Sequence, residues 1–408
     1  MGCRLNQYEI ESVSTALQQQ GALLVQKDEE ADFCIINSCV VTQKSEAKTR
    51  NLVYRSQKKT GSQKTIVTGC FAKILKKDEN TLYLPNDYKH FIPYIMNHWE
   101  EIQGLENLEP SRFKYNPPIH SSTTRVNVKI QDGCDEFCSY CIIPLVRGKP
   151  QSRPLDEVLT EIQTLVQKGF KELVITGITI GKYQWQEHNL ASLLKKALAL
   201  EGNFRLHLSS LDPHLVSPNL LEVLNHPQMV KHLHLSLQSG SNQVLKNMNR
   251  KYTQENFLNL VSQIRKIHPL FNLTTDIITG FPGETYLDHQ ETLKTLQKSQ
   301  FTHVHTFRYS PRPLTAAADF SSLVDENTKK EQSLEIVKMA RQIKRDFLKN
   351  FHGQQGWFLG EKKTPYGVYG HTDFYLPLFI KNQGIVNQLQ PIFYQYNQKE
   401  HLLEGRAL

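Results

Sequence analysis

The chain has 408 residues, of which 39% are hydrophobic and 22% charged, and it carries a formal net charge of +8. This is the composition of a globular protein with two or three domains, and it excludes a disordered chain. No apolar run approaches the roughly 18 residues of a membrane helix. The N-terminal stretch lacks the apolar segment of a secretory signal, so we expect a cytoplasmic protein that is not inserted in a membrane.

The first part of the chain, residues 1–108, alternates short β-branched runs with stretches of helix-like apolar spacing. We predict an N-terminal α/β domain with parallel strands at 32–37 and 64–69 and helices at 7–20 and 43–59. A polar, proline-containing segment over 109–122 is predicted to be a linker.

One stretch of this domain is strongly basic. Between Lys44 and Lys77 there are ten Lys or Arg residues against a single acid, Glu46. Such a run is either a solvated face or a surface that contacts nucleic-acid phosphates, and the sequence alone leaves both open.

Residues 123–350 show a regular alternation of strands and helices. Strands are predicted at 125–130, 172–177, 205–210, 232–237, 273–279 and 303–309. Parallel strands joined by right-handed crossovers predict a partial (β/α)6 barrel, with its chemistry at the carboxyl ends of the strands. A long helix over 326–351 follows, and the Tyr- and Phe-rich runs of 351–408 predict a small β domain.

Three of the seven cysteines, Cys134, Cys138 and Cys141, lie just after the first barrel strand. In a reducing compartment such clustering favours metal or catalytic roles over disulfides. A closed zinc site requires a fourth protein ligand, and the chain has no second CxxC and no HxxxH pair to supply it. Thiolates also hold iron–sulfur clusters, and three cysteines on a 4Fe–4S cluster leave one iron open to a small molecule.

A second set of cysteines is predicted at the edge of the N-terminal sheet. Cys39 and Cys70 each follow a predicted strand, and Cys3 immediately precedes the first helical stretch. These thiols are either buried structural groups or the ligands of a second cluster, again open at one iron. Cys34, in the middle of a strand, is interpreted as structural.

The C-x3-C-x2-C spacing resembles that of the radical S-adenosylmethionine (SAM) enzymes. The resemblance implies that SAM chelates the open iron and that electron transfer cleaves it to a 5′-deoxyadenosyl radical. By the same resemblance, contacts to SAM are expected at Tyr140, at Thr176 and Gly177 of "VITGITIG", and at Asp276 and Gly280 of "DIITGFPGET".

Nearly the whole chain resembles one family of these enzymes, the methylthiotransferases. The motifs that carry this resemblance are "GCRLNQYE", "NSCVVT", "TGC", "SSLDP", "HLHLSLQSGS" and "FRYSPRPLTAA". "GHTDFYLPLFI" resembles the family's tRNA-binding TRAM domain, although Phe374 stands where the family usually has Asn. The resemblance implies two 4Fe–4S clusters, with Cys3, Cys39 and Cys70 holding the cluster on which a sulfur atom is methylated by a first SAM.

Within this family the motifs are most similar to the branch that acts on N6-threonylcarbamoyladenosine at tRNA position 37. The implied reaction adds a methylthio group at C2 of the adenosine. This position has no acidic proton and no leaving group, so a cofactor must perform the difficult step. The implied partners are the tRNA anticodon stem-loop, an external electron donor and a sulfur source.

Alternatives remain open at this point. The sister branches act on isopentenyladenosine in tRNA or on a ribosomal-protein aspartate, and a protein of another class would bind nucleic acid through structural zinc without catalysis. Only Met1 and Gly2 precede Cys3, whereas the family motif ends a strand. We therefore expect roughly ten further N-terminal residues in the native protein, enough for a strand of ordinary length.

Overall fold

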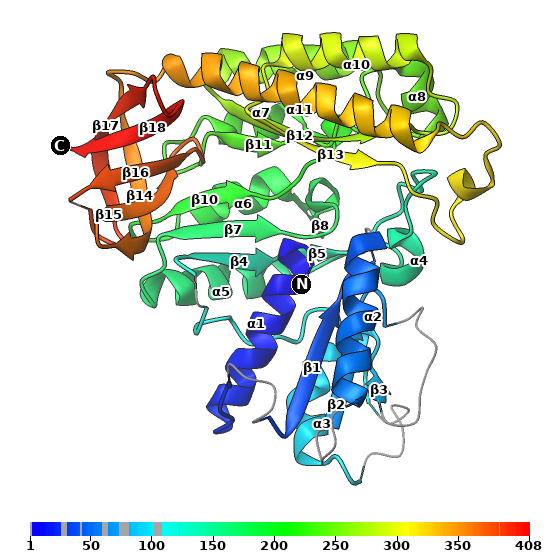
Figure 1. The fold of residues 1–408 in the computed structure, drawn as a ribbon. Helices are drawn as coiled ribbons and strands as arrows, with labels where there is room; N and C mark the ends of the chain where they lie inside the picture. The colour runs from blue at the N-terminus through cyan, green and yellow to red at the C-terminus, as the bar shows by residue number, and fades with distance from the viewer. Residues whose placement is uncertain are drawn as a thin grey trace.

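The computed structural model describes residues 2–25, 31–40, 43–58, 64–72, 81–101, 108–121, 123–382 and 384–408. An N-terminal α/β unit, a central curved sheet covered by helices and a C-terminal β-barrel follow one another along the chain (Figure 1). This is the α/β architecture expected from the sequence. None of the helices in these ranges combines the length and the apolar character that a bilayer crossing requires.

The N-terminal unit is a parallel sheet in the order β1-β2-β3 with helices beside it. Its elements are α1 (Arg4–Gln19), β1 (Phe33–Ser38), α2 (Gln43–Gln57), β2 (Lys64–Gly69), β3 (Thr81–Tyr83), the 3-10 helix η2 (Asn86–Phe91) and α3 (Ile92–Asn97). The two predicted strands and the two predicted helices are confirmed, whereas β3 was not predicted. Ser38 at the end of β1 lies beside Gly69 at the end of β2, so the two carboxyl ends meet.

Six parallel strands in chain order form the central sheet. They are β4 (Arg125–Lys129), β7 (Glu172–Thr176), β10 (Arg205–Leu208), β11 (His232–His234), β12 (Asn272–Thr279) and β13 (His303–Arg308). Bridges from Leu206 to Met229 and from Leu211 to Leu235 join the two halves of the sheet. All six strands lie where the sequence predicts them. β4 and β13 do not pair within the described chain, so the sheet is the expected partial barrel.

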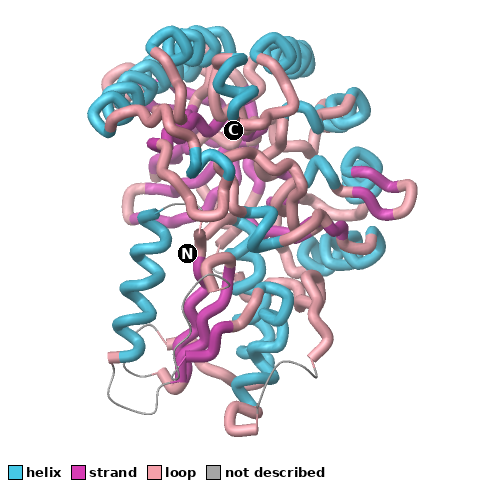
Figure 2. Tube along the Cα trace, turned by 90° about the vertical axis from the view of Figure 1, so that its right-hand side faces the viewer, coloured by secondary structure: helices cyan, strands magenta, loops and turns pink. Residues whose placement is uncertain are grey.

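Helices cover the outside of this sheet (Figure 2). The connecting helices are α5 (Leu155–Gln167), α6 (Leu190–Leu198), α7 (Pro218–Leu224), α8 (Asn242–Asn247), α9 (Gln254–Ile267) and α10 (Tyr286–Ser299), and α11 (Glu326–Lys349) follows β13. The shorter elements are β5 (Gln131–Asp132), α4 (Ile143–Arg147), β6 (Gln151–Ser152), η3 (Ile180–Lys182), β8 (Gln184–Trp185), β9 (His188–Asn189), η4 (Pro213–Leu215) and η5 (Ala316–Asp319).

The two faces of the central sheet differ in chemistry because side chains alternate along each strand. Apolar residues such as Val126, Leu173 and Leu233 join the surrounding helices in the largest hydrophobic core. The residues between them point to the concave side and are polar on most strands: Arg125, Lys129, Glu172, His207, His232, His234, Thr274, Asp276, His303 and His305. The concave face is therefore a polar, histidine-rich surface.

A closed five-stranded barrel ends the chain. Its strands are β14 (Gln355–Thr364), β15 (Gly367–Thr372), β16 (Pro377–Lys381), β17 (Leu389–Asn397) and β18 (Leu402–Ala407), in the order β14-β15-β16-β18-β17. The turn between β15 and β16 docks on the starting ends of the central strands, where the carbonyl of Phe374 accepts a bond from Asn272 at 2.8 Å. Phe374 itself is buried against Phe351, so it serves this junction as a core side chain.

Candidate active site

Cys39 and Cys70 are fixed by the paired ends of β1 and β2, and both are buried. The Cys70 N–H donates to the Ser38 carbonyl at 3.2 Å. This close approach depends on Gly69, which has a φ of +94° and whose added Cβ would collide with the Ser38 backbone. The Ser38 hydroxyl donates to the Thr68 carbonyl at 2.6 Å and so ties the two strand ends together again.

Cys3 reaches the same edge from the start of α1, where it is the N-cap residue. The Asn6 side chain donates to the Ser38 carbonyl at 2.9 Å, and Asn37 donates back to the Asn6 carbonyl at 2.8 Å. These bonds hold the first turn of α1 against the end of β1. Cys3 is exposed as a residue, unlike Cys39 and Cys70, but the protein packed around its thiol raises the pKa of Cys3, and the charge of Arg147 opposes this rise. The structure therefore brings the three predicted N-terminal cysteines to one sheet edge.

The second cysteine triad lies in the loop between β5 and α4. The Cys134 N–H donates to the Gly148 carbonyl and the Cys141 N–H to the Cys138 carbonyl, both at 2.9 Å. The loop is also anchored from the other half of the sheet, because Ser139 donates from its hydroxyl to the Asn247 carbonyl at 2.8 Å. This backbone frame fixes the three predicted cysteines in one loop at the carboxyl end of the central sheet.

The sulfur atoms of this triad have partners that suit a metal-bound thiolate. Arg250 donates from Nη1 to the Cys138 sulfur at 3.2 Å and is itself held by Asp212 and by the Ser236 carbonyl. Burial raises the pKa of the Cys141 thiol to about 12, so its thiolate form needs a cationic partner such as cluster iron. Three thiols with a guanidinium beside one of them fit a cluster that keeps one open iron.

Helix α4 connects the two triads, since it begins just after Cys141 and ends at Arg147. The Arg147 Nε donates to the Cys70 sulfur at 3.2 Å. Ile142 and Val146 pack in one apolar cluster with Cys70 and its neighbours. α4 thus links the loop of the second triad directly to Cys70 of the first.

Arg147 is the centre of a buried charge network that joins the N-terminal unit to the central sheet. It contacts Glu9 and Asp132 at 2.9 Å each, Lys129 bridges the same two carboxylates, and Lys89 pairs with Glu9 at 2.5 Å. Burial opposes ionisation, but these cations hold the pKa of Glu9 well below its usual range. Three cations face two carboxylates, and the surplus positive charge lies at Cys70.

Four of the five residues expected to contact SAM lie around the same carboxyl edge, and Asp276 lies deeper, in the middle of β12. Tyr140 packs edge-on against Phe281 at 6.4 Å between ring centroids. Thr176 ends β7 in a buried position, and Gly177 follows it where a Cβ would crowd the Gln131 carbonyl at 2.8 Å. The remaining two residues are Asp276, which lies on β12, and Gly280, which directly follows it. Asp276 lies on the concave face, and Gly280, with a φ of +66°, donates its N–H to Glu284.

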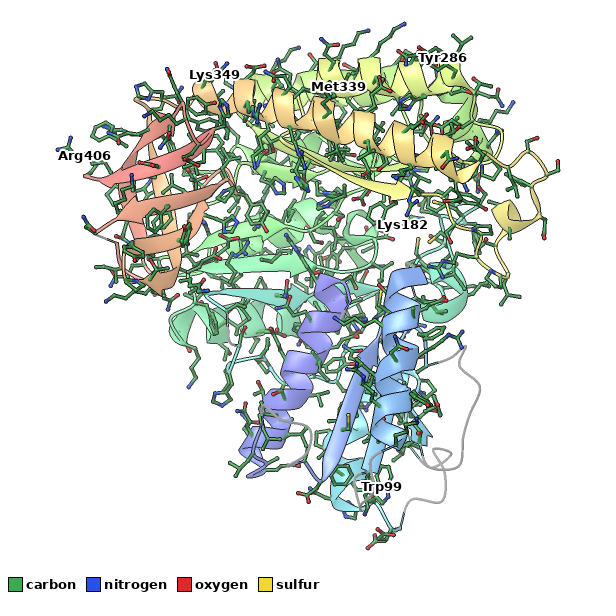
Figure 3. All side chains as sticks on the ribbon, viewed as in Figure 1. Trp99, Lys182, Tyr286, Met339, Lys349 and Arg406 are labelled. Carbon is green, nitrogen blue, oxygen red and sulfur yellow. The ribbon has the colours of Figure 1, made fainter. Side chains whose placement is uncertain are left out.

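Sequence reasoning missed several groups at this site. Glu9 lies within a quoted motif, but only the folded chain shows that it contacts Arg147 and that Arg147 contacts Cys70. Arg250 is far from the cysteines along the chain. Burial raises the pKa of Glu284 to about 7, which the sequence does not reveal. Lys182, labelled in Figure 3, pairs with Glu136 of the cysteine loop at 2.5 Å.

The structure describes only part of the basic run between Lys44 and Lys77. Lys48, Arg55 and Lys58 are exposed on or next to α2, whereas Lys64 is paired with Glu100 at 2.5 Å. Glu46, the one acid of the run, binds Arg312 of the central domain at 2.6 Å. Outside the described residues or side chains lie Lys44, Lys59, Lys73, Lys76 and Lys77.

The site and the partial barrel define a radical SAM protein, and comparison with known proteins agrees. The model of the "Radical SAM superfamily" matches residues 128–296, and that of "Uncharacterized protein family UPF0004" matches residues 1–87. The radical SAM methyltransferase TsrM from Kitasatospora setae shares the fold with a TM-score of 0.55 at 12% identity, over 76% of this chain and 73% of that one.

Sequence relatives narrow the class further. The threonylcarbamoyladenosine tRNA methylthiotransferase MtaB of Thermotoga maritima is 36% identical over 95% of this chain and 91% of its own length, and that of Bacillus subtilis is 33% identical over 93% and 89%. A tRNA-2-methylthio-N(6)-dimethylallyladenosine synthase from Endomicrobium trichonymphae is 32% identical over 89% and 87%. The chain belongs to the tRNA methylthiotransferase family, whose members use SAM and 4Fe–4S clusters. It is an enzyme of this class.

Proposed function

We propose that this enzyme adds a methylthio group at C2 of N6-threonylcarbamoyladenosine at position 37, beside the anticodon of tRNA. The observation that carries the proposal is the pair of cysteine triads linked by α4 and Arg147. Support for the substrate comes from the relatives named for threonylcarbamoyladenosine, which match at 30–36% identity along most of the chain. Because tRNA is the substrate, we place the reaction in the cytoplasm.

The two triads are assigned different tasks. Cys134, Cys138 and Cys141 hold the cluster that binds SAM, and the trio at the N-terminal sheet edge (Cys3, Cys39 and Cys70) holds the auxiliary cluster that carries the sulfur. When bound, these groups supply reductive cleavage of SAM and a methylated sulfur atom. The chain's own part is to keep the thiolates at fixed positions and to compensate their charge.

Two guanidinium groups perform that compensation. Arg250 stabilises the thiolate of Cys138 in the SAM-binding triad, and Arg147 stabilises that of Cys70 in the auxiliary triad. Charge-assisted bonds of this kind are stronger than neutral ones, and bonds to cluster sulfurs raise the reduction potential. Tyr140, Thr176, Gly177, Asp276 and Gly280 are proposed to line the SAM position.

RNA is proposed to contact two exposed surfaces. One is the basic face of α2, with Lys48 and Arg55 exposed beside Tyr54. The other is the β14–β15 hairpin of the C-terminal barrel, which exposes Lys362 and Lys363 together with the aromatic side chains of Trp357, Tyr366 and Tyr369. Cations bind phosphates and exposed rings stack on unpaired bases, as an anticodon loop requires. An external electron donor and a sulfur source complete the reaction.

The test is an anaerobic assay of the cluster-loaded enzyme with SAM, reductant and sulfide. It offers two tRNAs, one carrying threonylcarbamoyladenosine and one carrying dimethylallyladenosine, followed by nucleoside mass spectrometry. We expect the methylthio product only from the first tRNA. Methylthio product only from the second tRNA would instead indicate the sister reaction on dimethylallyladenosine. A Cys39→Ala control should form no product from either tRNA.

A further inference from the structure

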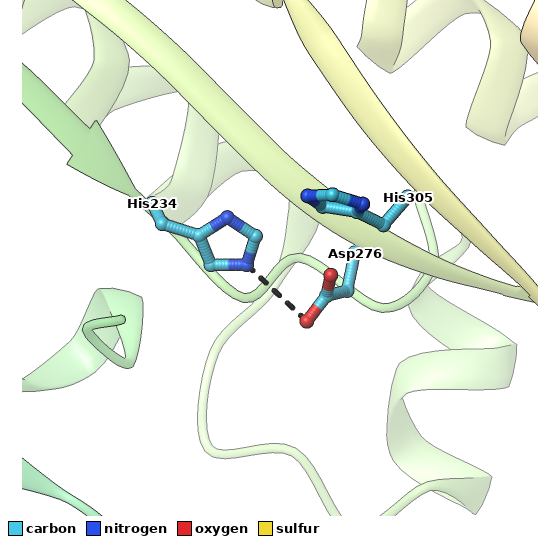
Figure 4. A group of neighbouring side chains, drawn as sticks. All are labelled: His234, Asp276 and His305. Atoms are coloured by element: carbon cyan, nitrogen blue, oxygen red, sulfur yellow. Dashed lines mark ion pairs between the residues drawn. The ribbon is translucent and has the colours of Figure 1, made fainter. Parts of the chain in front are cut away.

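Three side chains that commonly ligate metals meet on the concave face of the central sheet. His234 lies on β11, Asp276 on β12 and His305 on β13, and one ligand atom of each lies within 4.8 Å of the other two (Figure 4). The His234 Nε2 is 3.2 Å from the Asp276 Oδ2. Ser236, two residues beyond His234, contacts Arg250, so the cluster lies roughly 7 Å deeper than the guanidinium at Cys138.

Both histidines have their other ring nitrogen held by a neighbour. The His234 Nδ1 bonds the Thr274 hydroxyl at 3.0 Å, and the His305 Nδ1 bonds the His303 Nε2 at 3.2 Å. Metal-ligating histidines in proteins nearly always show this arrangement, because a partner on the second nitrogen fixes the tautomer and the ring orientation. The free nitrogens are thereby oriented before any ion binds.

The hydrogen-bond pattern leaves the His234 Nε2 without a proton. A chain of four hydrogen bonds crosses the sheet in the order Glu172–His207–His232–Thr274–His234. The carboxylate can only accept, so each of the other four groups, when neutral, donates its one proton towards Glu172. The His234 Nε2 lone pair then faces the Asp276 carboxylate at 3.2 Å, and a cation between the two groups would stabilise this contact.

A stabilising cation belongs at the His234 end of this chain, beside Asp276. At the other end Glu172 is already paired with Arg205 at 2.7 Å, and His207 is fully buried, so a further positive charge there would be costly. The Asp276 side chain is 28% exposed and His305 is exposed, so an ion can reach them. An extra proton would serve only the contact between His234 and Asp276, whereas a metal ion would also engage His305.

We propose that His234, Asp276 and His305 bind one divalent transition-metal ion of the zinc or ferrous type. Two neutral imidazoles and one carboxylate carry a net charge of −1, and this donor set suits such ions and leaves further coordination positions open. The 3.2 Å separation of the His234 and Asp276 ligand atoms is close to the roughly 3.4 Å edge of a tetrahedral site with ~2.1 Å bonds.

The test is a zinc-binding measurement on the cluster-loaded holoenzyme. The wild type and the variants Asp276→Asn and His305→Ala are incubated anaerobically with Zn²⁺, desalted, and analysed for zinc, iron and protein. The wild type should retain about one zinc per chain more than either variant, at equal iron content. His305 is exposed, so its truncation removes no core packing, and equal iron content verifies that each variant is folded.

Two controls sharpen the result. His226→Ala removes an exposed histidine outside the cluster and should bind zinc like the wild type. His303→Gln removes the group that orients His305 and should weaken binding about 10- to 100-fold. X-ray absorption spectra at the zinc edge should show nitrogen and oxygen donors. The proposal is overturned if the wild type retains no more zinc than the two ligand variants, or if the additional zinc has sulfur donors.

Discussion

Replacement of Arg147 by methionine tests the charge network between the two cysteine triads. The guanidinium is fully buried and donates to Asn6, Glu9, Asp132 and Cys70 at 2.6–3.2 Å. Methionine keeps an unbranched apolar stem, although it is shorter than arginine, and removes all these bonds. Both triads should respond, because Arg147 is the last residue of the helix that joins them.

The magnitude follows from what remains after the substitution. Breaking a buried ion pair costs about 3–5 kcal/mol when a charge is left uncompensated. Lys129 still contacts both Glu9 and Asp132 at 2.6–2.7 Å, which keeps the loss at the lower end, about 3 kcal/mol. The thiolate of Cys70 loses its only guanidinium donor in the described structure, so the auxiliary site should also hold less iron.

The assay is anaerobic urea unfolding of the holoenzyme together with iron analysis. Arg147→Lys is the matched variant: it keeps the charge but not the planar fork, so it should recover part of the stability and little of the bond to sulfur. Arg55→Met, an exposed position on α2, controls for the loss of a surface arginine. If Arg147→Met unfolds within about 0.5 kcal/mol of the wild type and binds the same iron, the network is not what joins the two units.

Further predictions concern the triads, the sheet edge and acid stability. Cys138→Ala should abolish both SAM cleavage and methylthiolation, and wild-type cleavage in this variant would contradict the assignment of its triad. Cys39→Ala and Cys70→Ala should retain reductive SAM cleavage but form no methylthio product, as measured by mass spectrometry of both products. Gly69→Ala should lower the free energy of unfolding by at least ~1–2 kcal/mol and reduce iron content, because φ is +94° there. Burial lowers the pKa of His207 from 6.5 to about 4, so the unfolded chain binds its proton first as the pH falls. Stability from this group is complete above pH 6.5 and falls by roughly 3 kcal/mol towards pH 4, a decline that His207→Gln should lack in pH-dependent urea titrations.

Much of the fold was predictable because its signals are local. The six central strands are short β-branched or apolar runs separated by amphipathic helices, and each was found at its predicted place. β3 (Thr81–Tyr83) was missed because three residues carry too little periodicity to stand out. Cys39 and Cys70 were placed at one sheet edge from strand order alone, and the register of β1 on β2 agrees with that placement.

The groups around the cysteines could not be predicted in the same way. Arg250 is separated from Cys138 by more than a hundred residues, and Glu9 is equally remote from Arg147, so only the tertiary structure pairs them. The alternating polar residues of the central strands were visible in the sequence, but period-2 alternation does not say which side chains of neighbouring strands meet. The assignments of individual cysteines and SAM contacts stay predictions.

The central claim is tested most directly by nucleoside mass spectrometry of tRNA from the native organism with this gene deleted. We predict that the 2-methylthio derivative of threonylcarbamoyladenosine disappears while unmodified threonylcarbamoyladenosine accumulates. Wild-type enzyme supplied in trans should restore the derivative, whereas Cys39→Ala should not. An unchanged level of this derivative in the deletion strain, or loss of the dimethylallyl derivative in its place, would contradict the account.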